Sequence, residues 1–185
     1  MELLQYPRDI QGEEIEKKIL LLEAAAWKPE AEERFPLAPS TYETSFLLME
    51  QGQVVSHAAV RKSPLFHAGE TYTAYGLSEV TTHPLWRKRG LGSRVVRAAG
   101  EYILSQKPDM SIFTCAPDKV SFYAAAGWEP LPGSCFVGGT KARPFRSDSL
   151  GLTVMIRWIS ERARARRRDF EDADIVFELG ENQLW

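Results

Sequence analysis

The fold is decided by the stretch Arg87-Lys88-Arg89-Gly90-Leu91-Gly92-Ser93. Three cations run directly into two glycines, with a β-branched segment before them and a helical pattern after them. Glycine has no Cβ, so the chain can turn tightly and bring backbone N–H groups close to a ligand. The N-terminus of the following helix adds unpaired N–H donors and partial positive charge. The stretch therefore predicts a phosphate-binding loop, although its spacing matches neither common nucleotide-binding motif.

Composition limits the class of protein. The chain has 185 residues, 44% of them hydrophobic, which suits one well-packed domain. A formal net charge of −2 gives no general attraction to nucleic acid or to anionic membranes. Two cysteines, Cys115 and Cys135, fit a reduced compartment, and no signal peptide or membrane-spanning run is apparent. We therefore expect a cytoplasmic protein with no membrane partner.

The hydrophobic periodicity predicts a mixed α/β domain that begins with a strand meander. Strands are predicted at residues 3–6, 44–50, 54–61, 70–82, 111–115, 150–159 and 175–179. Helices are predicted at residues 13–26, from residue 92 to about 107, 117–126 and 161–170.

Two motifs carry a family resemblance. The first reads Leu77-x-x-Val80-x-Thr82-His83-Pro84-x-x-Arg87-x-x-Gly90-x-Gly92, and the second reads Phe122-Tyr123-x-x-x-Gly127-Trp128. A predicted helix and strand separate them. In this arrangement they resemble the acyl-CoA-binding motif and the second motif of the GCN5-related N-acetyltransferases, the GNAT superfamily.

This resemblance implies a GNAT-type fold, a mixed and splayed β-sheet flanked by helices, in one domain over residues 1–185. Its core would span about residues 44–133, and residues 134–185 would complete the acceptor side. Pantetheine would bind the strand edge, and the pyrophosphate would lie over the glycine loop. The implied cofactor-binding residues are Val80, Thr82, Arg87, Lys88, Arg89, Gly90, Leu91, Gly92 and Ser93.

The chemistry implied is transfer of an acetyl group from acetyl-CoA to a primary amine of a small molecule, by direct attack in a ternary complex and without a metal. Tyr123 would be the acid that protonates the leaving thiolate. Glu79 is the candidate base, acting through water, with a solvated strand residue as the alternative interpretation. Because Glu79 and Val80 are adjacent, they point to opposite faces unless a bulge intervenes.

The acceptor side is predicted from a second, fainter similarity to the aminoglycoside 2′-N-acetyltransferases. It rests on residues 123–130 and on Trp185, and it makes Trp27 and Trp185 candidate substrate residues. Acidic residues at 30–43 and near the chain end would attract a cationic acceptor. One departure from the family is that residues 115–123 contain no Asn, so Ser121 or backbone would replace its contact with pantetheine.

Two other functions remain open. The same fold could serve as a non-catalytic module that senses acyl-CoA or binds a partner. In either case the protein is expected to be a monomer or a homodimer. The arginine run at residues 162–168 could bind nucleic acid, but its cations wrap around a helix without interleaved aromatics. We expect instead a solvated helix paired with Glu161, Asp169, Glu171 and Asp172. His83 is interpreted as a turn residue, and no metal-ligand spacing is present.

Overall fold

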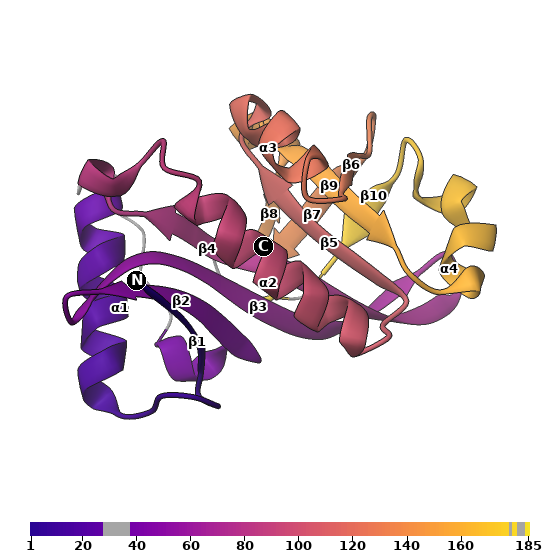
Figure 1. Cartoon of the computed structure of the whole chain (residues 1–185). Coiled ribbons are helices and arrows are strands. Elements are labelled where there is room, and N and C mark those ends of the chain that lie inside the picture. The colour runs from indigo at the N-terminus through magenta and orange to yellow at the C-terminus, as the bar shows by residue number, and fades with distance from the viewer. Residues whose placement is uncertain (28–37, 178, 181–183) are drawn as a thin grey trace. The chain divides into compact units, whose positions relative to one another are not determined.

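The computed structural model describes residues 1–27, 38–177, 179–180 and 184–185 (Figure 1). Its helices are α1 (Glu13–Ala26), α2 (Leu91–Ser105), α3 (Val120–Ala124) and α4 (Glu161–Ala165). Its strands are β1 (Glu2–Tyr6), β2 (Thr44–Glu50), β3 (Gln53–His67), β4 (Glu70–Thr82), β5 (Met110–Cys115), β6 (Glu129–Pro130), β7 (Cys135–Gly139), β8 (Pro144–Arg146), β9 (Thr153–Trp158) and β10 (Asp174–Val176).

The described strands form a large mixed sheet and a small one. The large sheet has the order β1-β2-β3-β4-β5-β9-β6, and the small one has the order β10-β7-β8. In the large sheet β4 and β5 are parallel, whereas β1–β2, β2–β3, β5–β9 and β6–β9 are antiparallel. The predicted mixed α/β class is confirmed. The chain divides into two compact units, residues 1–61 with 77–102 and residues 62–76 with 103–185.

Unit 1, residues 1–61 and 77–102, carries α1 and most of α2 on its part of the sheet. The apolar stripe of α1 packs in a cluster formed by Tyr6, Ile15, Ile19, Leu22, Leu47 and Val54. The ring of Phe46, next to Leu47 on β2, lies 5.9 Å from the ring of Tyr102 on α2. Because adjacent strand residues point to opposite faces, α1 and α2 cover opposite faces of this part of the sheet.

Unit 2, residues 62–76 and 103–185, has its core on β5. Phe113 makes edge contacts with Tyr123 at 4.8 Å and with Trp128 at 5.6 Å between ring centroids. The Trp128 indole donates from Nε1 to Ser111 Oγ over 3.0 Å, which satisfies its buried polar atom. These contacts fix α3 and the segment after it on β5.

The strands β4 and β5 pair over a short register. Their partners are Ala74 with Met110 and Tyr75 with Ser111, whereas β4 continues to Thr82 and β5 to Cys115.

The helical predictions differ from the structure where helices are short. The predicted helix at 117–126 is a 3-10 helix, Pro117–Lys119, followed by the five residues of α3. The predicted helix at 161–170 divides likewise into α4 and a 3-10 helix, Arg167–Phe170. Segments this short gain few intrahelical bonds, so packing decides how tightly they wind. The strands β7 and β8 were not predicted, because their Gly- and Pro-rich sequence lacks alternation.

Asp109 ties the start of β5 to its surroundings. Its carboxylate accepts bonds from Thr73 N at 2.8 Å, Ser160 Oγ at 2.7 Å and Arg162 Nη2 at 2.7 Å. Burial raises the pKa of Asp109, but the bonds from Arg162, Ser160 and the Thr73 N–H together hold that pKa below its usual 3.8. A carboxyl group whose pKa is lower in the folded than in the unfolded state stabilises the fold when the pH is above the unfolded pKa. That stabilisation is lost as the pH falls through the folded pKa.

We expect Asp109→Asn to lower the free energy of unfolding by about 1–3 kcal/mol at neutral pH. The difference from wild type should shrink as pH falls from the unfolded pKa of 3.8 through the lower folded pKa, because residue 109 is then neutral in both folded proteins. Urea denaturation of both proteins at neutral pH and at about pH 3 measures this. A difference that does not depend on pH would contradict the proposed role of the charge.

Candidate active site

The predicted phosphate loop lies between β4 and α2 in unit 1. A 3-10 helix, Pro84–Trp86, leads into it, and left-handed backbone occurs at Lys88, with φ 63°, and at Gly90, with φ 73°. Helix α2 begins at Leu91, and its first turn closes with a bond from Arg94 N to Gly90 O over 3.2 Å. The N–H groups of residues 91–93 precede that bond, so they have no partner within α2, and such groups at a helix N-terminus suit an anion.

The described residues leave open space beside Gly90 in the loop. A Cβ placed on Gly90 would meet none of their atoms within 4 Å. Lys88 and Arg89 are exposed, and the Arg89 guanidinium lies 4.8 Å from the centroid of the Trp86 ring. The loop thus combines the backbone donors at the start of α2 with two exposed cations.

Arg87 has a different set of contacts. Its Nε donates to Thr82 O over 3.1 Å, and its Nη2 donates to Ala26 O over 3.3 Å. The side chain therefore joins the ends of β4 and α1 to the loop. The neighbouring His83 is a turn residue, as predicted, because its Nδ1 accepts the N–H of Leu85 at 3.3 Å and caps the 3-10 helix.

The end of β4 departs from regular strand geometry at Glu79, where the sequence analysis left a bulge possible. Glu79 adopts left-handed backbone with φ 50°, which is rare for a residue with a side chain and interrupts the simple alternation of the strand. Val80 and Thr82 are partly buried. The Thr82 hydroxyl lies 2.9 Å from Ser56 Oγ, so the side chain of Thr82 is directed toward β3.

Glu79 belongs to a polar cluster that contains Tyr42 and Arg61. Tyr42 is 7% exposed, and no described residue hydrogen-bonds its hydroxyl. Burial raises the pKa of Tyr42 far above its usual value, the charges of Glu79 and Glu23 raise it further, and Arg61 opposes them. Burial also lowers the pKa of Arg61, while Tyr42 and Glu79 favour its charged form. The cluster therefore places a cation and a neutral phenol beside Glu79.

A buried Glu23–His57 pair, which sequence reasoning missed, completes the cluster. Oε1 of Glu23 lies 3.3 Å from Nδ1 of His57, and both side chains are at most 3% exposed. The two groups are not aligned for a hydrogen bond. A sequence signal did exist, because Glu23 follows Ile19 by four residues and so continues the apolar stripe of α1. A carboxylate on a buried helix face requires a polar partner.

Tyr123 on α3 is the candidate acid in unit 2. It is 8% exposed, and its ring is held edge-on by Phe113 at 4.8 Å and Phe122 at 4.9 Å. Burial raises the pKa of Tyr123 well above its usual value, and the charge of Cys115 adds a smaller effect. No hydrogen bond to its hydroxyl is present among the described residues. The phenol is therefore protonated at neutral pH.

The two cysteines are buried free thiols, as predicted. Burial raises the pKa of Cys115 to about 11, the charge of Asp118 adds to this, and Lys119 opposes it. A thiol with such a pKa is not a nucleophile at neutral pH. Acyl transfer through Cys115 therefore has no support in this structure.

The candidate acceptor residues lie in separate places along the chain. Trp27 follows α1, is partly buried, and donates its backbone N–H to Glu23 O over 3.0 Å. Trp185 is 5% exposed. Its carbonyl accepts the Thr114 N–H at 2.8 Å, and its indole lies where a Cβ on Gly76 would be. The acidic positions 30, 32, 33, 178 and 181 lie outside the described residues.

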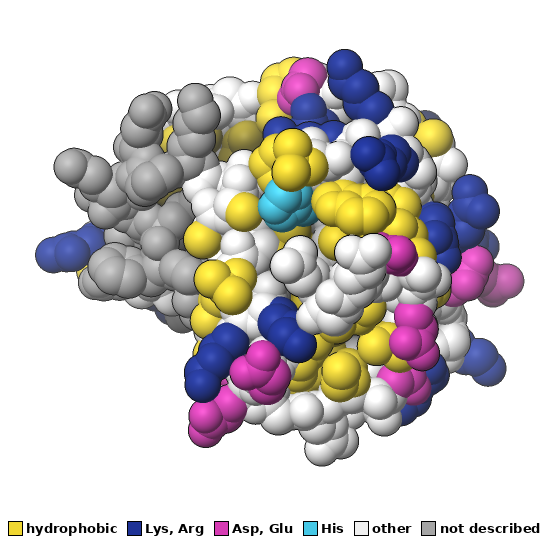
Figure 2. Space-filling model, turned by 60° about the vertical axis from the view of Figure 1, so that its left-hand side comes forward, with side chains coloured by type: hydrophobic (Ala, Val, Ile, Leu, Met, Phe, Trp, Pro, Cys, Tyr) yellow, Lys and Arg dark blue, Asp and Glu magenta, His cyan; other side chains and the backbone are white. Residues whose placement is uncertain are grey.

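The arginine run forms ion pairs, as predicted. Arg166 Nε lies 2.5 Å from Asp169 Oδ2, and Arg167 Nε lies 3.4 Å from Glu171 Oε1. Arg162 pairs with Asp109. On the face shown in Figure 2, lysine and arginine side chains are interspersed with acidic and hydrophobic ones. Among the described residues there is no helix long and apolar enough to span a membrane, and no group of three His, Cys, Asp or Glu side chains suited to a metal.

Comparison with known proteins decides the family. The model of an acetyltransferase (GNAT) domain matches residues 7–131, which include the loop, Glu79 and Tyr123. The chain belongs to the GNAT acetyltransferases. No curated protein matches it.

Solved structures share the GNAT fold. Escherichia coli ElaA superposes with a TM-score of 0.62 at 15% identity, covering 84% of this chain and 98% of that one. A Brucella melitensis GNAT acetyltransferase in complex with acetyl-CoA gives a TM-score of 0.54 at 19% identity, over 69% of this chain and 83% of that one. A probable N-acyltransferase from Enterococcus faecalis gives 0.56 at 23% identity over 70% of this chain. The chain spans about a third of the Enterococcus protein, 32% of its length.

Proposed function

We propose that this GNAT acetyltransferase transfers the acetyl group of acetyl-CoA to a primary amine of a small molecule. The observation that carries the proposal is the loop at residues 87–93, which lies inside the GNAT match and in which the described residues leave open space beside Gly90. The Brucella relative, which was solved with acetyl-CoA, supports the choice of donor.

The donor side of the proposal uses charge and backbone geometry. The N–H groups of residues 91–93, at the positive end of α2, would bind the pyrophosphate. Lys88 and Arg89 would add charge-assisted bonds, because both cations are exposed. Arg87 would act as a positioning residue, because its guanidinium already binds Thr82 O and Ala26 O. The backbone of Val80 and Thr82 would bind pantetheine.

The chemical steps need one base and one acid. The neutral amine attacks the thioester carbonyl carbon, and the new C–N bond forms as the carbonyl π electrons move to oxygen. Collapse of this adduct breaks the C–S bond and releases coenzyme A as a thiolate. Glu79 takes the proton from the nitrogen, directly or through water, and Tyr123 gives its proton to the sulfur. No covalent enzyme intermediate is required.

Calorimetric titration of the full chain with acetyl-CoA tests the donor assignment. We expect one saturable site per chain, because one loop of this kind is present in the sequence. Absence of binding would contradict the proposal at its first step.

Glu79→Gln tests the base. The amide keeps the size of the side chain but accepts no proton, so we expect kcat to fall roughly 10²-fold or more with acetyl-CoA affinity retained. The acidic limb of the rate profile should also change, which a purely structural role would not produce. The matched control is Glu101→Gln, an exposed position on α2. An unchanged kcat would show that Glu79 is the solvated strand residue of the alternative interpretation.

Two tryptophans are the candidates for the acceptor side. We propose that Trp27 and Trp185 contact the acceptor, because an indole is apolar and has a face that attracts cations. The backbone of Trp185 is held by Thr114, which gives its largely buried indole a fixed position.

A further inference from the structure

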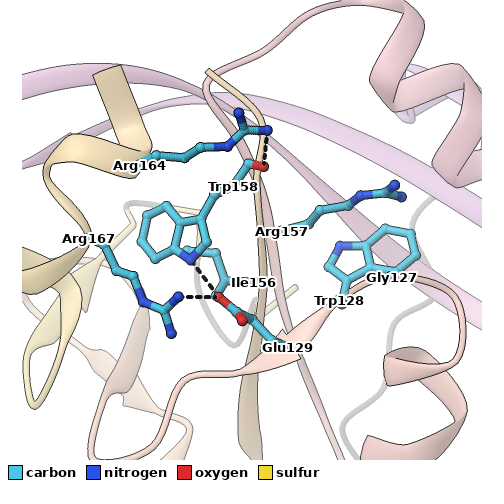
Figure 3. Close-up of a pocket in the computed structure, with 8 residues that line it drawn as sticks. All are labelled: Gly127, Trp128, Glu129, Ile156, Arg157, Trp158, Arg164 and Arg167. Atoms are coloured by element: carbon cyan, nitrogen blue, oxygen red, sulfur yellow. Dashed lines mark hydrogen bonds and ion pairs between the residues drawn. The ribbon is translucent and has the colours of Figure 1, made fainter. Parts of the chain in front are cut away.

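Trp185 occupies part of one edge of β5 within unit 2. Along the other edge β5 pairs over its whole length with β9, and residues 156–158 at the end of β9 line the pocket shown in Figure 3. Along the edge away from β9, β4 pairs with Met110 and Ser111. Farther along this edge the partner of β5 is Trp185, whose carbonyl accepts the Thr114 N–H at 2.8 Å.

The strand pairing explains why this N–H is directed away from β9. In an antiparallel pair the N–H groups of successive residues point alternately toward the partner strand and away from it. Thr114 lies opposite Val154 on β9, and the Val154 carbonyl accepts the N–H of Leu131 at 2.9 Å instead. The Thr114 N–H is therefore an edge donor of β5, and Trp185 uses it as the main chain of an added strand would.

Further contacts fix Trp185 at this edge. The Thr114 hydroxyl donates to the same carbonyl of Trp185. A Cβ on Gly76 would overlap Cε3 of the indole, so the missing side chain of Gly76 makes room for this ring. The Phe177 ring lies 5.0 Å from the ring of Trp185 and stacks on Phe136 at 4.7 Å between centroids. Both the main chain and the ring of Trp185 are thus held in place.

The occupied edge lies beside the proposed acid. Phe113, which precedes Thr114, has its ring 4.8 Å from the ring of Tyr123, and Cys115, which follows Thr114, interacts electrostatically with Tyr123. If Tyr123 protonates the leaving thiolate, an acceptor has to approach this part of β5 to reach the thioester. The edge of a sheet can bind an extended peptide as an added strand through main-chain hydrogen bonds. At Thr114 the donor for such a bond is already in use.

We propose, as an inference that rests on the proposed function, that Trp185 is a specificity-determining residue that excludes extended peptides and reserves the site for compact amines. A peptide that paired with this edge would have to displace the Trp185 carbonyl from Thr114. It would also have to free the indole from Gly76 and Phe177. A compact amine needs no main-chain partner at this edge, so the occupied donor does not hinder it.

A matched pair of acceptors tests the inference. Alaninamide and a hexapeptide that begins with alanine present the same reactive amine on acceptors of different length. Steady-state rates with acetyl-CoA are measured for the full-length wild type, Trp185→Gly, Gly76→Ala and the control Trp185→Phe, which keeps an aromatic ring at this position. We expect the wild type and the control to prefer alaninamide. In Trp185→Gly and Gly76→Ala, kcat/KM for the hexapeptide should rise roughly tenfold or more, about 1.4 kcal/mol.

A gain of peptide activity is a result that damage to the fold would not produce. The new Cβ of Gly76→Ala would also come within 2.7 Å of the Ile112 carbonyl, so Trp185→Gly is the safer variant to fold. Fluorescence anisotropy of the hexapeptide, labelled at its C-terminus, gives its affinity for each protein without turnover, and this affinity should follow the same order.

The two measurements separate failure of this inference from failure of the proposed function. A wild type that acetylated neither amine would count against the proposed function, whereas the peptide affinities would still decide the inference. Hexapeptide binding to Trp185→Gly no tighter than to the wild type would overturn the inference. Acetylation of the hexapeptide by the wild type as readily as of alaninamide would also overturn it.

Discussion

Tyr123→Phe is expected to lower kcat roughly 10²-fold to 10⁴-fold while acetyl-CoA affinity stays unchanged. The substitution removes only the hydroxyl, so the edge contacts with Phe113 and Phe122 remain. Burial keeps the phenol protonated at neutral pH, so the wild-type enzyme has a proton ready for the leaving thiolate. Steady-state rates with an accepted amine, together with calorimetric titration of acetyl-CoA, measure both quantities.

The matched control is Tyr102→Phe, which removes a hydroxyl that donates to Glu43 within unit 1. Its rate should stay close to that of the wild type. If Tyr123→Phe also left turnover intact, Tyr123 would be a core aromatic and another group would supply the proton. A non-catalytic acyl-CoA sensor would show no turnover in the wild type and would be indifferent to this substitution.

Gly90→Val is expected to weaken acetyl-CoA binding at least tenfold, about 1.4 kcal/mol. Gly90 has φ 73°, a conformation that a β-branched residue adopts only with strain of about 1–3 kcal/mol. The new side chain would also project into the open space over the loop, where the pyrophosphate is proposed to bind. Calorimetry of the variant with acetyl-CoA gives the change in affinity.

Gly52→Val separates the strain of the backbone from the loss of the binding site. Gly52 has φ 76°, and a Cβ there would also meet nothing within 4 Å, but it lies in the turn between β2 and β3. Both variants should therefore lose similar stability, whereas only Gly90→Val should lose affinity. Equal affinities for the two variants would remove the loop from the donor site.

The sequence predicted the elements with strong local patterns. Helix α1 and strands β2 and β4 have the predicted bounds, because periodicity and turn residues mark both ends of each. The short elements were predicted less well. Strand β7 ends in two glycines and pairs with β8 and with the distant β10, so its partners rather than its own sequence make it a strand.

For the candidate site, the sequence predicted the loop and the two motif residues but not the surroundings of Glu79. The left-handed backbone at Glu79 has no sequence signal, because a bulge depends on strand pairing. Tyr42 and Arg61 interact with Glu79 because the folded sheet brings their segments together. Their spacing in the sequence does not predict this. The role of Arg87 as a clamp likewise requires knowledge of where Ala26 and Thr82 lie.

Release of coenzyme A thiol from acetyl-CoA in the presence of a panel of amines tests the proposed acetyl transfer directly. The panel contains aminoglycosides, polyamines, amino acids and peptides, and mass spectrometry detects the acetylated product. We expect at least one small primary amine to give thiol release equal to acetamide formation, and Tyr123→Phe to slow both together. Binding of acetyl-CoA without acetylation of any amine of the panel above the uncatalysed rate would contradict the proposed function.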